Sequence, residues 1–274
     1  MTLLLRDEED ILRANIEFHR AMGVDFFIAT DNKSVDSTAE ILKEYERQGL
    51  VHYIYEGTDD YSQTEWVTKM ARLAASEFDA TWVINNDADE FWWPMNHSDL
   101  RSELEAVPWD RNIVQAERLN FVPVDGSAES FYSSMVYRKK ITLNGDGGPL
   151  LPKVAHRAIP DVTVAQGNHR VWGFNQSAVV HDAIEIQHFP LRRYAQFENK
   201  IVKGGQAYER NEKLAAGVGH FWKRLYKEYE KGKLMQYYKE ESYSPGRIQH
   251  GIKSGELIVD DRLPKFLNTL NNKS

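Results

Sequence analysis

Apolar runs and amphipathic stretches alternate along the first ninety residues. Four short apolar runs have the length of buried strands: 2–5, 24–30, 50–56 and 80–86. An amphipathic stretch separates each run from the next and predicts a helix: one after residue 10, one to about residue 48 and one near 64–78. Strands that alternate with helices of this length are typical of β-α-β units, so the sequence predicts an α/β fold with a mainly parallel sheet flanked by helices.

Two of these helices carry more specific patterns. The first is expected to bury the face formed by Ile11, Ala14, Phe18 and Ala21. The second is expected to begin at Ser37, because Ser37 and Glu40 have the spacing of a capping box.

The pattern is looser beyond residue 95. Strands are expected at 112–124 and at three later segments, around 150–157, 161–165 and 178–188. Residues 191–208 predict a helix that breaks at the adjacent pair Gly204 and Gly205, and residues 219–238 predict one amphipathic helix. We therefore expect a single domain over 1–215 and a C-terminal helical extension over 216–274, packed on the same domain.

Composition limits the function classes. The chain has 274 residues, a net charge of −7 and no cysteine, which argues against a general nucleic-acid binder and excludes disulfides and thiolate zinc sites. No apolar run has the roughly 18–20 residues that a membrane span needs, so no transmembrane segment is expected, and peripheral membrane contact is left open. The start lacks the pattern of a signal peptide, and a cytoplasmic location is expected.

Two polar clusters follow predicted strands directly. Asp31 to Asp36 follow the second strand, and Asp87, Asp89 and Glu90 follow the fourth. Ligands bind at the carboxyl ends of strands in such sheets. If the chain stays extended, alternation places Asp87 and Asp89 on one side, where paired carboxylates suit a hard cation such as Mn²⁺ or Mg²⁺. The alternative is that one of these aspartates only stabilises a turn through its own backbone.

The quoted motifs "DNKSVDST" and "WVINNDADEFW" resemble those of family 2 glycosyltransferases with the GT-A fold, in particular the branch with a D-x-D-E-F motif. The resemblance covers residues 2–95 well and the remainder more loosely. It implies a GT-A-like fold and a D-x-D pair, Asp87 and Asp89, that holds a divalent metal bridging the diphosphate of the donor. It also implies a base- and ribose-binding loop at 31–38, from which Asn32 and Lys33 depart.

The donor is expected to be a nucleoside diphosphate sugar, with UDP as the nucleotide. Arg6 follows the first strand and would lie at the same edge of the sheet, where it meets a phosphate or the base; a solvated loop charge is the alternative. The expected donor-binding residues are Arg6, Asp31, Asn32, Ser34, Asp36, Gln63, Lys69 and Asp87.

Further candidates come from the same resemblance. A histidine in the second half of such enzymes often completes the metal site, and His169 is preferred here over His188, each with a structural histidine as the alternative. Inverting transfer also needs a general base for the acceptor hydroxyl. The candidates are Asp182, Glu90 and Asp125, with Glu117 as a rival. Trp92 and Trp93 fit either a sugar-stacking surface or the core.

We therefore expect a metal-dependent glycosyltransferase that moves a sugar to a hydroxyl on a glycan, polysaccharide or lipid-linked acceptor, with inversion of configuration. One alternative is a nucleotidyltransferase, although the segment "LLLRDEED" lacks its glycine-rich phosphate loop. The other is a non-catalytic carbohydrate-binding protein on a transferase-like fold.

Overall fold

The computed structural model describes the chain except for residues 61, 127–129, 145–146, 176–177, 212–217 and 273–274. Contacts divide the chain into two compact units. Unit 1 comprises Met1–Thr58, Ser62–Arg118 and Leu151–Gln187, and unit 2 comprises Asp59–Tyr61, Leu119–Leu150 and His188–Ser274. The predicted boundary between residues 215 and 216 lies outside the described residues.

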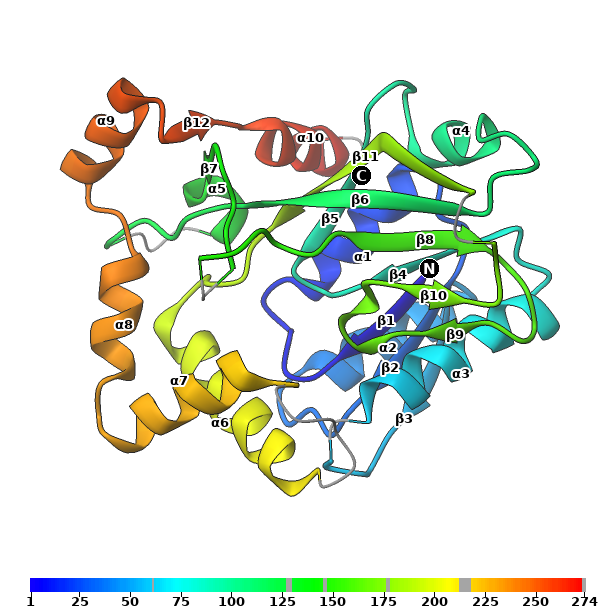
Figure 1. The fold of residues 1–274 in the computed structure, drawn as a ribbon, viewed down its shortest axis with the longest axis horizontal. Coiled ribbons are helices and arrows are strands. Elements are labelled where there is room, and N and C mark those ends of the chain that lie inside the picture. The colour runs from blue at the N-terminus through cyan, green and yellow to red at the C-terminus, as the bar shows by residue number, and fades with distance from the viewer. Residues whose placement is uncertain (61, 127–129, 145–146, 176–177, 212–217, 273–274) are drawn as a thin grey trace. The chain divides into compact units, whose positions relative to one another are not determined.

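Unit 1 is built on the predicted alternation of strands and helices (Figure 1). Its first elements are β1 (Thr2–Leu5), α1 (Leu12–Ala21), β2 (Phe27–Asp31), α2 (Thr38–Arg47), β3 (Val51–Tyr55), α3 (Gln63–Ser76) and β4 (Trp82–Asn86). Then follow β5 (Glu90–Pro94), α4 (Leu100–Glu105), β6 (Ile113–Asn120), β8 (Lys153–Arg157), β9 (Thr163–Val164), the 3₁₀ turn η1 (Gln166–Asn168), β10 (Val171–Trp172) and β11 (Val179–His188).

Eight strands form one sheet in the order β3-β2-β1-β4-β8-β6-β11-β5. The pairs β3–β2, β2–β1 and β1–β4 are parallel, whereas β8 is antiparallel to both β4 and β6. The predicted fold class, a GT-A-like α/β sheet flanked by helices, agrees with this architecture. The antiparallel strands come from the part of the chain where the sequence pattern is loose.

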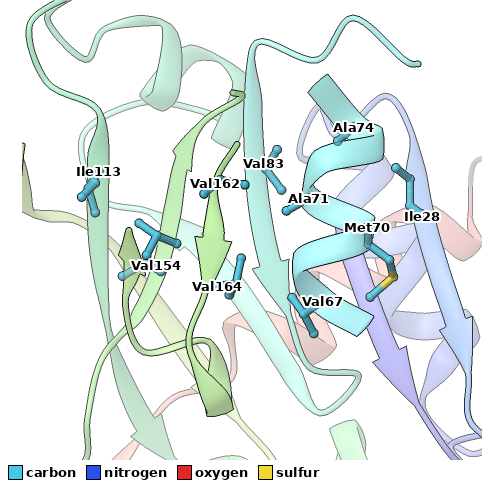
Figure 2. Packing of buried hydrophobic residues seen from close by; sticks show 11 residues of the cluster. Ile28, Val67, Met70, Ala71, Ala74, Val83, Ile113, Val154, Val162 and Val164 are labelled. Atoms are coloured by element: carbon cyan, nitrogen blue, oxygen red, sulfur yellow. The ribbon is translucent and has the colours of Figure 1, made fainter. Parts of the chain in front are cut away.

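Helix α3 packs on the sheet through an apolar stripe (Figure 2). Val67, Met70 and Ala71 are buried against Ile28 of β2 and Val83 of β4. Met70 and Ala71 lie three and four positions after Val67, so the three residues share one face of the helix. This packing holds the parallel part of the sheet, whose carboxyl edge carries the polar clusters.

The buried face of α1 differs from the prediction. Ile11 and Phe18 are buried as predicted, but Ala14 is half-buried and Ala21 is exposed, and the helix also buries Leu12, Asn15, Ile16 and His19. The stripe is rotated because two polar side chains occupy core-facing positions. A hydrophobic pattern cannot predict this, since it assigns polar residues to the solvent.

The second helix begins where the sequence predicts, but without a capping box. Ser37 is the N-cap of α2, yet its hydroxyl makes no capping hydrogen bond. The Asp36 carboxylate accepts from Thr38 N at 3.0 Å instead, and the Ser37 N–H donates to the Glu9 carboxylate at 2.9 Å. Nearby carboxylates therefore satisfy the amide groups at this helix start.

Unit 2 contains the remaining elements: α5 (Phe131–Ser134), β7 (Tyr137–Lys139), α6 (Tyr194–Arg210), α7 (His220–Glu230), α8 (Leu234–Glu241), α9 (Pro245–Ser254), β12 (Leu257–Val259) and α10 (Arg262–Asn271). Strands β12 and β7 form an antiparallel pair. None of the helices in the described chain is long and apolar enough to cross a membrane.

Two predictions about these helices are wrong. Helix α6 continues through Gly204 and Gly205, because the missing side chains make room for α7: a Cβ on Gly204 would lie 2.8 Å from Trp222, and one on Gly205 would overlap Tyr226. The single helix predicted over 219–238 is two helices, α7 and α8. Gly232 lies between them with φ of 69°, a left-handed conformation that ends a helix.

Candidate functional site

The carboxyl ends of β1, β2 and β4 meet at one edge of the sheet in unit 1. These strands are parallel, so Arg6, Asp31 and Asp87, which end or follow them, lie at that edge. Strand β8 runs in the opposite direction, with Ile84 paired to Ala155. Two residues further along this register, Lys153 at the start of β8 lies beside the end of β4.

The residues Asp87 to Glu90 form a tight turn. The Glu90 N–H donates to the Asp87 carbonyl at 3.1 Å, and β5 begins at Glu90. The chain is not extended here, so the expected strand alternation of Asp87 and Asp89 is wrong. The three carboxylates differ in exposure: the Asp87 side chain is 31% exposed, while Asp89 is 3% exposed and Glu90 is fully buried. Asp87 is therefore the accessible member of the cluster.

Two cations from later strands face these carboxylates. The Lys153 ammonium, on a residue only 1% exposed, forms an ion pair with Asp87 Oδ2 and lies 3.3 Å from Glu90 Oε1. Arg118 of β6 lies 3.7 Å from the same Glu90 oxygen. Burial raises the pKa of Glu90 to about 7, opposed by the Lys153 ammonium and reinforced by Asp87. With all groups ionised, three carboxylates and two cations leave one net negative charge.

The η1 turn supplies an amide to Asp87, and His169, the next residue, lies within the influence of the Lys153, Arg118 and Asp87 charges. Asn168 Nδ2 donates to Asp87 Oδ1 at 3.1 Å. Gln63, the first residue of α3, holds this turn by accepting from Gly167 N at 3.0 Å. His169 Nδ1 donates to the Pro152 carbonyl at 2.8 Å, which leaves Nε2 with its lone pair. Burial, helped by the Lys153 charge, lowers the pKa of His169 to about 4, so the imidazole is neutral near pH 7.

Helix α1 holds the carboxylate turn from the side of the core. Asn15 Nδ2 donates to the carbonyls of Ala88 and Glu90, at 3.0 and 2.8 Å, and Asn15 Oδ1 accepts from Asn86 at 3.2 Å. His19 Nε2 accepts from Trp92 N at 3.1 Å. Asn15, Asn86, His19 and Trp92 are each at most 1% exposed. These buried bonds fix the backbone that carries Asp87, and they place Trp92 in the core.

The loop after β2 is fixed by short-range bonds. Asp31 is 1% exposed and accepts from Ser34 N at 2.9 Å and from Tyr53 Oη at 3.2 Å. Asn32 donates to the carbonyls of Glu56 and Thr58, at 3.2 and 2.6 Å. This asparagine, a departure from the motif, therefore ties two loops together. The Ser34 hydroxyl accepts from the Asp7 N–H at 2.9 Å, so the loops after β1 and β2 are joined.

The other predicted residues lie in different surroundings. Lys69 is exposed on α3, along a surface groove of about 450 Å³. Asp182 is exposed on β11 with φ of 59°, and Glu117 is exposed on β6. Asp125 and His188 belong to unit 2, where His188 Nδ1 lies 2.6 Å from Asn120 Oδ1. Their roles in binding and catalysis stay predictions.

The fit of a divalent cation depends on Asp87. Within the described residues, no group of three His, Asp or Glu side chains is arranged to hold a metal ion. Magnesium-type sites, however, use one or two protein carboxylates, with water and substrate phosphates as the other ligands. Asp87 is partly exposed, and each of its oxygens has a second lone pair beyond the bonds to Lys153 and Asn168. The residues fit a cation whose shell a bound diphosphate completes, and they do not form a preformed all-protein site.

Sequence reasoning missed three members of this cluster: Lys153, Arg118 and Asn168. The one local indication is a lysine at the start of the apolar segment "KVAH", a position where a buried strand rarely carries a charge. Nothing in the sequence places that segment beside Asp87, which is 66 residues away along the chain. The antiparallel register of β8 brings the two together.

Comparisons with known proteins identify the family. No curated protein matches the chain. The crystal structure of S. aureus TarS 1-349 in complex with UDP is similar at 11% identity, over 78% of this chain and 66% of that chain, with a TM-score of 0.43. The structure of the same protein in complex with UDP-GlcNAc is similar at 10% identity, over 78% of this chain and 67% of that chain, also with a TM-score of 0.43. The model of glycosyltransferase family 92 matches residues 2–231. The chain therefore belongs to glycosyltransferase family 92, which confirms the expected enzyme class, with family 92 in place of the family 2 that its motifs resemble.

Proposed function

We propose that this glycosyltransferase transfers a sugar from a nucleoside diphosphate donor, with UDP as the nucleotide, to a hydroxyl group on a glycan, polysaccharide or lipid-linked acceptor. The observation that carries the proposal is the cluster at the carboxyl edge of the sheet. There the partly exposed Asp87 pairs with the buried Lys153 ammonium and accepts from the Asn168 amide, and its charge acts on the neutral imidazole of His169. A diphosphate with its cation is a ligand whose charges match this arrangement.

Each residue of the cluster has a proposed part in donor binding. Asp87 and His169 would hold Mn²⁺ or Mg²⁺, with Asp89 as the predicted second carboxylate of the motif. A bound cation would supply a Lewis acid that stabilises the leaving diphosphate. The loop with Asp31, Asn32 and Ser34 would contact the nucleoside, as the motif resemblance implies, and Arg6 would bind a phosphate or the base.

Glu90 is proposed as a support for the cluster. Its side chain is fully buried and lies against Lys153 and Arg118, so it has no access to an acceptor in solvent. Asp182 stays the predicted general base in an inverting transfer. It is exposed on β11 next to Ala183, whose carbonyl accepts from Met95 N just beyond the end of β5 that is farthest from Glu90. A cytoplasmic location stays a prediction.

Calorimetry with UDP, GDP and ADP, each with and without Mn²⁺, tests the proposal. We expect UDP to bind more tightly than the other nucleotides, and Mn²⁺ to strengthen its binding. Asp87→Asn should remove the effect of Mn²⁺ and retain the secondary structure, measured by circular dichroism. Failure of all three nucleotides to bind in the presence of Mn²⁺ would contradict the proposal, and binding of sugars alone would favour the carbohydrate-binding alternative.

A further inference from the structure

Lys153 is a buried cation at the point where the donor diphosphate is proposed to bind. It is 1% exposed, and its ammonium contacts two carboxylates, Asp87 and Glu90. A lysine of this kind is costly to bury unless its charge is paired. Glu90 is buried as well, and neither of its carboxylate oxygens has a hydrogen bond within the described residues. The ionised form of Glu90 is therefore stabilised by the charges of Lys153 and Arg118.

The ammonium affects cations and anions in opposite ways. A divalent cation that binds Asp87 meets the positive charge of Lys153 on the same carboxylate, and the two repel each other. A diphosphate that arrives at Asp87 meets the same charge as an attraction. Lys153 is buried at the start of β8 and pairs with Glu90, so a move into solvent to relieve the repulsion would leave Glu90 without this partner.

We propose that Lys153 is a permanent positive charge in the site, which weakens metal binding in the nucleotide-free protein and strengthens binding of the diphosphate. This inference rests on the proposed function. The cation and the diphosphate then enter the site together, since the negative diphosphate offsets the repulsion between the cation and Lys153. A resident positive charge also keeps Asp87 paired when no donor is present. Lys153 is thus a positioning residue that couples the binding of the cation to the binding of the diphosphate.

The opposite signs separate this role from a purely structural one. Damage to the fold weakens the binding of every ligand, whereas loss of the Lys153 charge strengthens one and weakens the other. Lys153→Met keeps most of the apolar stem of the side chain and removes the ammonium group with its charge. Lys153→Arg keeps the charge and serves as the conservative control.

The experiment measures Mn²⁺ alone and UDP alone. Binding of Mn²⁺ to nucleotide-free protein is followed by the electron paramagnetic resonance signal of free Mn²⁺, and binding of UDP without metal by calorimetry, both at low salt. We expect Lys153→Met to bind Mn²⁺ about tenfold more tightly and UDP about tenfold more weakly, from the loss of one unit charge a few ångströms from each ligand. Lys153→Arg should stay within about threefold of the wild type for both.

A second pair of variants covers the case in which Lys153→Met does not fold. Glu90→Gln and the double variant Glu90→Gln/Lys153→Met differ by the same single charge, without an unpaired buried glutamate, and should show the same opposite changes. Unchanged or weaker Mn²⁺ binding on loss of the Lys153 charge overturns the proposal. The Mn²⁺ measurement needs no nucleotide, so it decides the effect of Lys153 on metal binding even if UDP fails to bind and the proposed function is wrong.

Discussion

The bonds from Asn15 to the carboxylate turn make a quantitative prediction for Asn15→Asp. This change preserves the shape of the side chain and replaces its NH₂ group with an oxygen. The carbonyls of Ala88 and Glu90, now bonded at 3.0 and 2.8 Å, would lose their donor in the core. An unsatisfied buried group costs about 1–3 kcal/mol, so the loss of the donor to both carbonyls should lower the free energy of unfolding by about 2–6 kcal/mol.

Urea unfolding followed by circular dichroism measures this loss at pH 7. The matched control is Asn268→Asp, the same substitution at an exposed position in helix α10, for which we expect a change below about 1 kcal/mol. The turn also carries Asp87, so Asn15→Asp should weaken UDP binding in the presence of Mn²⁺. A loss of stability no larger than that of the control would refute the inference that α1 holds the turn through these bonds.

Three further predictions concern a buried histidine, the helix pair of unit 2 and the motif aspartate. Burial lowers the pKa of His19 to about 3, so the folded protein favours neutral His19, and this group contributes a loss of stability as pH falls below 6.5. Between pH 7.5 and 5, urea unfolding should show that the wild type loses about 2 kcal/mol more than His19→Gln, which keeps the losses from the other histidines whose pKa burial lowers. Gly205→Ala should lower the melting temperature through overlap with Tyr226, at a cost of about 1–3 kcal/mol, whereas Gly246→Ala, with open space around its Cβ, should leave it unchanged or raise it. Asp89→Ala should abolish Mn²⁺-dependent donor hydrolysis without changing the circular dichroism spectrum, and turnover at the wild-type rate would rule out its part in metal binding.

The local pattern of the sequence was sufficient for the first half of the sheet. Alternating apolar runs and amphipathic stretches predict β1 to β4 and the helices between them to within a few residues. The same pattern places Asp31 and Asp87 at strand ends, because parallel strands present their carboxyl ends at one edge. These features depend on short-range periodicity, which a single sequence contains.

Predictions failed where a residue's environment comes from distant parts of the chain. Gly204 and Gly205 look like a helix break, but the close approach of Trp222 and Tyr226 keeps them within α6. Asn15 looks like a surface position of α1, but it is buried because it binds the turn that follows β4. In each case a tertiary contact outweighs the local preference of the residue.

The charges of the site show most clearly which features are local in the sequence and which come from the tertiary structure. The sequence by itself determined that three carboxylates follow β4, with no cation among residues 82–94. Only the tertiary structure decided that Lys153 and Arg118 neutralise part of that charge. Strand β8, antiparallel to both β4 and β6, begins at the edge where Asp87 lies, and β6 ends there. Pairing between strands far apart in sequence sets which charges meet, and that information is not local.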